Sequence, residues 1–202
     1  RGVPDVRRGL GGRVFEMAAT FTELLAPYPK LRRYVHLYHP DLQGPMDTAE
    51  QLWGSDIFYA FAESRDLLHR LLTRAAEAQL HLAAEFRKLC VDRLDPEGTI
   101  QHGCPTPGRL LIRNDSSILL SRGMYEEFVR PHDARVLREV GGGSIHFCGN
   151  GDHLIEAMLA IPELRGFDFG QPEMMDIPAI YARCRERRVA CVRLSPPRED
   201  LA

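Results

Sequence analysis

The chain has 202 residues, 44% of them hydrophobic, which is enough for one domain with a substantial core. Its formal net charge of -2 argues against nucleic-acid binding through a basic surface, and no apolar run approaches the roughly 20 residues that span a bilayer. Five scattered cysteines do not resemble a secreted disulfide framework. The sequence therefore predicts a cytoplasmic protein that acts on a small molecule, without nucleic-acid or membrane partners.

The first ninety residues are predicted to be mostly helical. Apolar residues at near-helical spacing predict a helix over 15–25, and a longer helical region covers 49–89 with a break near 53–55. Between them, the β-forming run at 34–39 predicts a strand that Pro40 ends. In the Gly-Pro loop that follows, Gly44 either lets the backbone approach a ligand or is a simple turn glycine. Asp47 or Thr48 can cap the next helix.

The remaining sequence alternates strands with helices. Segment 90–108 is rich in glycine and proline and is predicted to be a loop, of a length that is often functional or mobile. Strands are predicted at 109–115, 144–148, 166–170 and 190–194, with helices at 121–140, 154–161 and 176–188; Pro131 kinks or splits the first of these helices. Because no hairpin signal interrupts this alternation, we expect five parallel strands, neighbours in chain order, with helices outside.

This pattern predicts a particular α/β fold. A (β/α)8 TIM barrel needs about 250 residues, and the chain begins with Arg-Gly-Val-Pro rather than methionine. We therefore expect residues 1–202 to form a single, incomplete TIM-barrel domain that lacks the N-terminal strands and the C-terminal end.

Polar residues end the strand predicted at 109–115. In such barrels the site lies at the carboxyl ends of the strands, so Asp115 is a candidate base, ligand or hydrogen-bond acceptor. An aspartate at this position can equally cap a turn. We expect Asp115 and Ser116 to lie at that end of the barrel, in the same cleft as His146.

The pair His146 and Cys148 ends the next strand. Residues two apart in a strand point to the same side, and imidazole and thiolate are both zinc ligands. Zinc needs a third ligand from elsewhere. The alternative is that Cys148 packs as a small apolar residue while His146 hydrogen-bonds to the backbone.

Several segments together resemble one enzyme superfamily. These are Leu-Gln-Gly-Pro at 42–45, Leu-Trp-Gly at 52–54, the run Asn-Asp-Ser-Ser-Ile-Leu-Leu-Ser at 114–121, Met-Tyr-Glu-Glu-Phe-Val-Arg-Pro at 124–131, and Ile-His-Phe-Cys-Gly-Asn at 145–150. They are similar to the uroporphyrinogen decarboxylase superfamily, which contains haem-pathway decarboxylases, relatives of cobalamin-independent methionine synthase, and corrinoid-dependent methyltransferases. The resemblance runs from about Tyr34 to the C-terminus and implies a TIM barrel.

Within that superfamily, His-x-Cys resembles the zinc ligands of the corrinoid methyltransferases. The resemblance implies that His146 and Cys148 bind zinc, with a further cysteine ligand near the C-terminus, for which Cys191 is the candidate inside this chain. It implies methyl transfer to a thiol from a corrinoid, carried on a partner protein. Ser116 falls where the decarboxylases have a serine that contacts substrate.

Two other functions stay open. The first is uroporphyrinogen decarboxylation in haem biosynthesis. The enzymes that catalyse it carry a tyrosine-containing loop that differs from the sequence around Gly44, and His-x-Cys is not their pattern. The second is a non-catalytic or partner-completed barrel fragment, because an incomplete barrel leaves strand edges unpaired.

Overall fold

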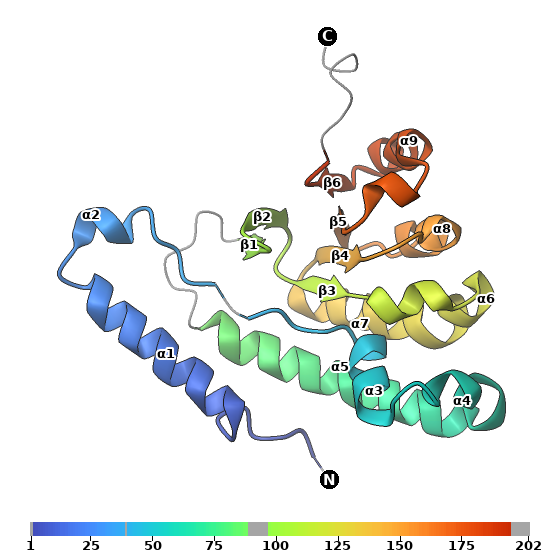
Figure 1. Ribbon diagram of the computed structural model, residues 1–202, viewed down its shortest axis with the longest axis horizontal. Helices are drawn as coiled ribbons and strands as arrows, with labels where there is room; N and C mark the ends of the chain where they lie inside the picture. Colours follow the sequence, from blue (N-terminus) through green and yellow to red (C-terminus); the bar gives the residue numbers. More distant parts are fainter. Residues whose placement is uncertain (1, 39, 89–96, 195–202) are drawn as a thin grey trace.

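The computed structural model describes residues 2–38, 40–88 and 97–194 (Figure 1). Its N-terminal part is helical and comprises α1 (Leu10–Leu25), α2 (Pro29–Arg32), α3 (Pro45–Trp53), α4 (Ile57–Glu63) and α5 (Arg65–Arg87). The break predicted near 53–55 lies at Gly54, which ends α3 with a φ of 86°. None of the described helices is long and apolar enough to cross a membrane.

The C-terminal half is an α/β unit. Its strands are β3 (Leu111–Arg113), β4 (Gly143–Phe147), β5 (Leu164–Phe169) and β6 (Ala190–Val192). Between them lie η1 (Asp115–Leu119), α6 (Arg122–Met124), the π-helical η2 (Tyr125–Val129), α7 (Arg130–Val140), η3 (Asp152–Leu154), α8 (Ile155–Leu159), η4 (Pro172–Met174) and α9 (Ile177–Arg187). Pro131 sits in the first turn of α7, where its missing N–H is tolerated, and the helical run from 122 to 140 continues through it, with the π-helical η2 directly before α7.

The sheet confirms the parallel α/β prediction for four of the five strands. Its order is β3-β4-β5-β6, and every neighbouring pair is parallel. Figure 1 shows α8 and α9 on one side of this sheet. Within the described residues the sheet is open, so the closed barrel remains an expectation.

Alternation along the strands separates an apolar face from a polar one. Ile145 pairs with Phe167 and Phe147 with Phe169, and these side chains are buried in the core. The rings of Phe147 and Phe169 meet edge to face, with centroids 5.5 Å apart. The intervening residues, His146 and its neighbour Asp168, therefore point to the opposite face of the sheet.

The prediction of a strand at 34–39 is wrong. Residues 34–38 are irregular, and position 39 lies outside the described residues. Tyr34, Val35 and Tyr38 are exposed, so the β-forming side chains have no sheet face to cover, and propensity alone does not make a strand. The chain meets the sheet only later, where Gln43 forms a single parallel bridge with Arg113.

The loop predicted at 90–108 contains a β-hairpin that the sequence did not reveal. Strands β1 (Gly98–Gln101) and β2 (Cys104–Pro107) are antiparallel, joined by His102 and Gly103 with φ values of 51° and 72°. Two positive φ angles are typical of a type I′ hairpin turn, which usually carries Asn-Gly. No hairpin signal is present in the sequence here, because a histidine replaces the usual asparagine in the turn and β2 contains two prolines. Residues 89–96 of the predicted loop lie outside the described residues.

Candidate functional site

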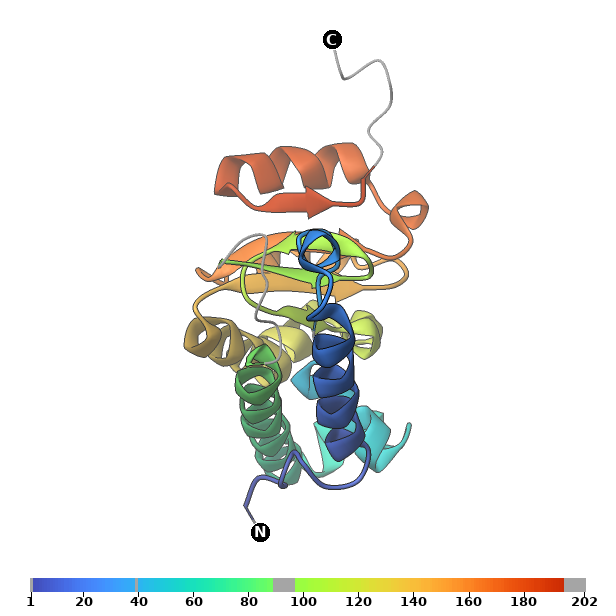
Figure 2. The ribbon, with the colours of Figure 1, turned by 90° about the vertical axis from the view of Figure 1, so that its left-hand side faces the viewer.

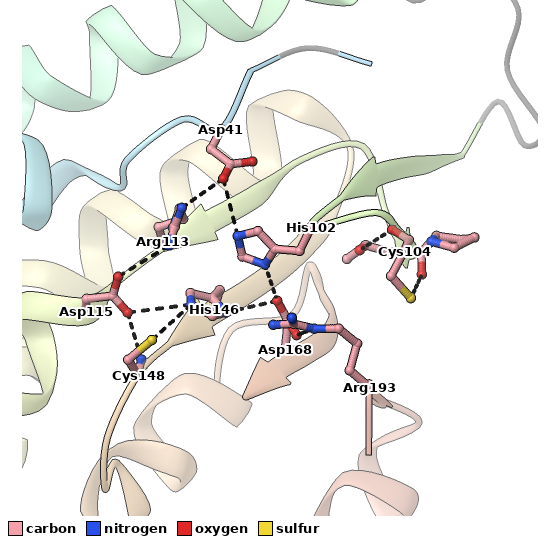
Figure 3. A network of polar contacts seen from close by, with 11 residues as sticks. Asp41, His102, Cys104, Arg113, Asp115, His146, Cys148, Asp168 and Arg193 are labelled. Carbon is pink, nitrogen blue, oxygen red and sulfur yellow. Dashed lines mark hydrogen bonds and ion pairs between the residues drawn. The ribbon is translucent and has the colours of Figure 1, made fainter. Parts of the chain in front are cut away.

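A cluster of titratable side chains covers the polar face of the sheet (Figure 3). His146 comes from β4 and Asp168 from β5, which are directly paired in the sheet. Asp115 follows β3, Cys148 follows β4, and His102 reaches the cluster from the hairpin turn. The parallel register thus brings together residues that are far apart in the chain.

His146 uses its two ring nitrogens on opposite sides. Its Nδ1 lies 2.9 Å from Oδ2 of Asp168. Its Nε2 lies 3.5 Å from Sγ of Cys148 and 3.6 Å from Oδ1 of Asp115. Because an ionised carboxylate only accepts hydrogen bonds, Asp168 holds the proton on Nδ1 and leaves the lone pair of Nε2 facing Cys148 and Asp115.

Three members of the cluster are hydrogen-bonded to Asp168. It is buried, and its carboxylate accepts hydrogen bonds from His146, from Nδ1 of His102 at 2.8 Å and from Nε of Arg193 at 2.6 Å. Burial alone raises the pKa of Asp168, but the hydrogen bonds from His146, Arg193 and His102 outweigh it and hold the pKa well below its usual range. Asp168 is therefore an anion at neutral pH.

His102 occupies an uncommon backbone conformation. Its φ of 51° is in the left-handed region, which few residues other than glycine, asparagine, aspartate and histidine adopt. Its Nε2 also lies 3.3 Å from Asp41. The turn thus holds the side chain of His102 between the carboxylates of Asp41 and Asp168.

Asp115 is fixed through its own side chain and through its backbone. Its Oδ1 accepts a hydrogen bond of 2.7 Å from the backbone N–H of Cys148. Its own N–H and that of Ser116 donate to the two carboxylate oxygens of Asp47, at 2.9 and 2.8 Å. Asp47 is buried, and its burial raises its pKa to about 6 despite these bonds. Asp47 lies in the first turn of α3 and also caps η1. The two elements are far apart in the sequence, so the sequence alone did not predict this contact.

Three of these side chains form a possible metal site. The donor atoms of Asp115, His146 and Cys148 all lie within 4.8 Å of one another, as do those of a second group, His102, His146 and Asp168. Burial, and then the neighbouring Asp115, raise the pKa of the Cys148 thiol. Without a cation beside it, the thiol therefore keeps its proton.

The charge of the cluster favours a cation. Three carboxylates, from Asp41, Asp115 and Asp168, are paired with two guanidinium groups, from Arg113 and Arg193. With both histidines neutral, one negative charge is left over. A divalent metal ion would compensate it, whereas an anionic ligand would add to it.

The other predicted site residues have different surroundings. Ser116 donates hydrogen bonds to Asp47 through its backbone N–H and its hydroxyl, so it attaches η1 to α3. Gly44 donates to the carbonyl of Arg113 at 2.8 Å, and a Cβ there would lie 2.6 Å from that oxygen and from Oδ1 of Asn114. The close backbone approach accounts for the glycine, and its contact with a cofactor stays a prediction.

Cys191 does not extend the metal cluster, contrary to the expectation that it supplies the further ligand. In the register it pairs with Phe167, whereas Asp168 pairs with Val192. Cys191 therefore shares the apolar face of the sheet, where its thiol hydrogen-bonds to that of Cys184 on α9. Because side chains alternate along the strand, Cys191 lies on the face of the sheet opposite the candidate metal site.

Sequence reasoning missed several members of the cluster, namely Asp41, His102, Arg113, Asp168 and Arg193. The signal for Asp168 was present, because an aspartate between two phenylalanines in a short strand needs a partner for its charge. No protein-family model matches the chain, and a search among curated proteins finds no significant match.

Proposed function

We propose that this protein binds zinc through Asp115, His146 and Cys148 and uses it to activate a thiol for methyl transfer from a corrinoid. The observation that carries the proposal is the convergence of Nε2 of His146, Sγ of Cys148 and the carboxylate of Asp115. Catalytic zinc typically has three protein ligands and keeps a fourth position open, and imidazole nitrogen, thiolate sulfur and carboxylate oxygen each bind it.

The residues present fit such an ion. His146 would bind through Nε2, because Asp168 accepts the proton on Nδ1, which is the usual carboxylate–histidine–metal arrangement. Cys148 would bind as a thiolate and would release its proton on binding. The bond from its N–H to Asp115 keeps the two ligands side by side. When bound, zinc lowers the pKa of a thiol that shares its coordination sphere.

The resemblance to the corrinoid methyltransferases supports the proposed reaction. In that reaction a sulfur–carbon bond forms and the cobalt–carbon bond breaks, with both electrons of the broken bond remaining on cobalt. The acceptor thiol loses its proton. The corrinoid would be presented by a partner protein, and the acceptor would be a small thiol.

The alternative, decarboxylation of a tetrapyrrole bearing several acetates, is disfavoured by charge. The cluster already has more carboxylates than guanidinium groups. A polyanionic substrate would meet this excess negative charge in a partly buried site, where Coulomb repulsion is stronger than in water.

An anaerobic assay tests the proposed reaction. Zinc-loaded protein, free methylcobalamin and a small thiol such as 2-mercaptoethanol are mixed, and the loss of the cobalt–carbon absorbance is followed. We expect zinc-dependent demethylation, reduced by about 100-fold or more in Cys148→Ala and unchanged in Ser121→Ala, a matched substitution at the N-cap of α6. Equal rates in Cys148→Ala and the wild type, or consumption of uroporphyrinogen by the metal-free protein, would contradict the proposal.

A further inference from the structure

Two free cysteines meet between α9 and β6, away from the candidate metal site. Cys184 and Ile180 are the buried residues of α9 and lie one turn apart on the same face of the helix. The chain leaves α9 through a tight turn, in which Arg188 has a φ of 56° and the N–H of Val189 donates to the carbonyl of Cys184 at 2.9 Å. Val189 is buried in the same core. Cys191 lies two residues further on, so strand alternation points its side chain to the side of Val189 and Cys184.

The two thiols differ in reactivity. They hydrogen-bond to each other, and this bond lowers the pKa of Cys191, although partial burial opposes the effect. The same bond, and then burial, raise the pKa of Cys184. Cys184 is 1% exposed, whereas Cys191 is half-buried on the edge strand. Because the thiolate is the nucleophile, Cys191 is the more reactive and the more accessible of the two.

We propose that Cys184 and Cys191 are a peroxide-sensitive pair that forms a disulfide and thereby fastens β6 to α9. The contact between the two side chains carries the proposal, since a thiol next to an oxidised cysteine resolves it to a disulfide. Figure 2 shows α9 lying along β6 at one end of the sheet.

The oxidation needs one molecule of hydrogen peroxide per pair. The Cys191 thiolate attacks one peroxide oxygen, so that a sulfur–oxygen bond forms, the oxygen–oxygen bond breaks and the departing hydroxide takes up a proton as water. The sulfur of Cys184 then attacks the sulfenic sulfur of Cys191. The sulfur–sulfur bond forms, the sulfur–oxygen bond breaks, and the proton of Cys184 leaves with the second oxygen as water. The two thiols lose two electrons in total, and the peroxide gains them.

The disulfide would act on a weakly held strand that reaches the candidate site. β6 is three residues long and, in the described sheet, pairs with β5 alone. Arg193 follows it directly and donates from Nε to Asp168 at 2.6 Å. A covalent bond to α9 therefore fixes the strand from which this arginine extends. The proposal does not depend on zinc or on methyl transfer.

Peroxide titration of the whole chain, followed by mass-spectrometric peptide mapping, tests the pair. We expect a disulfide between Cys184 and Cys191 in the folded protein, and amide hydrogen exchange in β6 that is on the order of 10-fold slower than in the reduced protein. In Cys184→Ala, Cys191 should stop at the sulfenic acid, which dimedone labels. In Cys191→Ala, Cys184 should stay a thiol at the same dose. Cys104→Ala, at a half-buried cysteine on the hairpin, is the matched control and should form the disulfide as the wild type does.

Circular dichroism confirms that each variant is folded before it is oxidised. A folded wild type in which Cys191 passes to the sulfinic acid without a disulfide, or in which it pairs with a cysteine other than Cys184, would overturn the proposal. So would a disulfide that leaves hydrogen exchange in β6 unchanged, because β6 would then not be fastened.

Discussion

Replacing Asp168 by alanine should weaken zinc binding by about 10- to 100-fold and destabilise the fold by roughly 3–5 kcal/mol. Asp168 is 1% exposed and accepts hydrogen bonds from His146, His102 and Arg193. Without the carboxylate, the ring of His146 loses the contact that fixes its orientation, and Arg193 loses its charge partner. Isothermal titration with zinc and urea denaturation measure the two effects.

Asp176→Ala is the matched control for this prediction. Asp176 caps the N-terminus of α9 by accepting from the N–H of Ala179 at 3.1 Å, so its loss should cost about 1 kcal/mol and leave zinc affinity unchanged. If Asp168→Ala binds zinc as tightly as the wild type, Asp168 does not position the ligand.

Raising the pH from about 4 to about 7 should lower the free energy of unfolding by on the order of 2–4 kcal/mol, because of Asp133. Asp133 is fully buried and accepts hydrogen bonds from Asn114 at 2.6 Å and from Tyr125 at 2.9 Å. Burial outweighs these bonds and raises its pKa from 3.8 to about 7. Between these two values the folded protein keeps a proton that the unfolded chain has lost, so stability falls as the pH rises.

Two other aspartates modify this profile. Asp47, with a pKa raised to about 6, adds to the loss of stability over the same window. Asp168, whose pKa is lowered, acts in the opposite direction and removes stability as the pH falls below about 4. Burial lowers the pKa of His132 to about 4, so the unfolded chain binds a proton between about pH 4 and pH 6.5 that the folded protein does not, and this partly offsets the loss of stability in that window.

Urea denaturation across pH 4–8 measures the profile. Asp133→Asn keeps an oxygen that can accept both hydrogen bonds but does not titrate, so it should flatten the fall between pH 4 and 7. Asp176→Asn should leave the slope as it is. An Asp133→Asn protein with the wild-type slope would show that Asp133 does not titrate in this range.

The sequence predicted that Asp115 lies near His146 and Cys148, and local periodicity carries the information needed for that prediction. His146 and Cys148 lie two apart in a strand that the pattern identified, and Asp115 ends the preceding strand of the sheet. A parallel sheet brings the carboxyl ends of neighbouring strands together. These two facts are enough to place the three residues near one another.

The contacts that support the site depend on tertiary structure, which periodicity does not encode. Asp47 reaches η1 across 68 residues of sequence. His102 enters from a hairpin whose turn lacks the usual Asn-Gly signal. The strand at 34–39 failed for a related reason, because β propensity is realised only where a paired neighbour and a face to cover are present.

The most direct test of the zinc site is metal analysis combined with zinc X-ray absorption of protein purified without chelator. We predict one zinc per chain, with a sulfur ligand at about 2.3 Å and nitrogen or oxygen ligands at about 2.0–2.1 Å. Cys148→Ala should lose the sulfur ligand and most of the metal, and His146→Ala should lose most of the metal as well. Stoichiometric zinc surviving both substitutions, or a wild-type protein that binds none when zinc is supplied, would contradict the site described here.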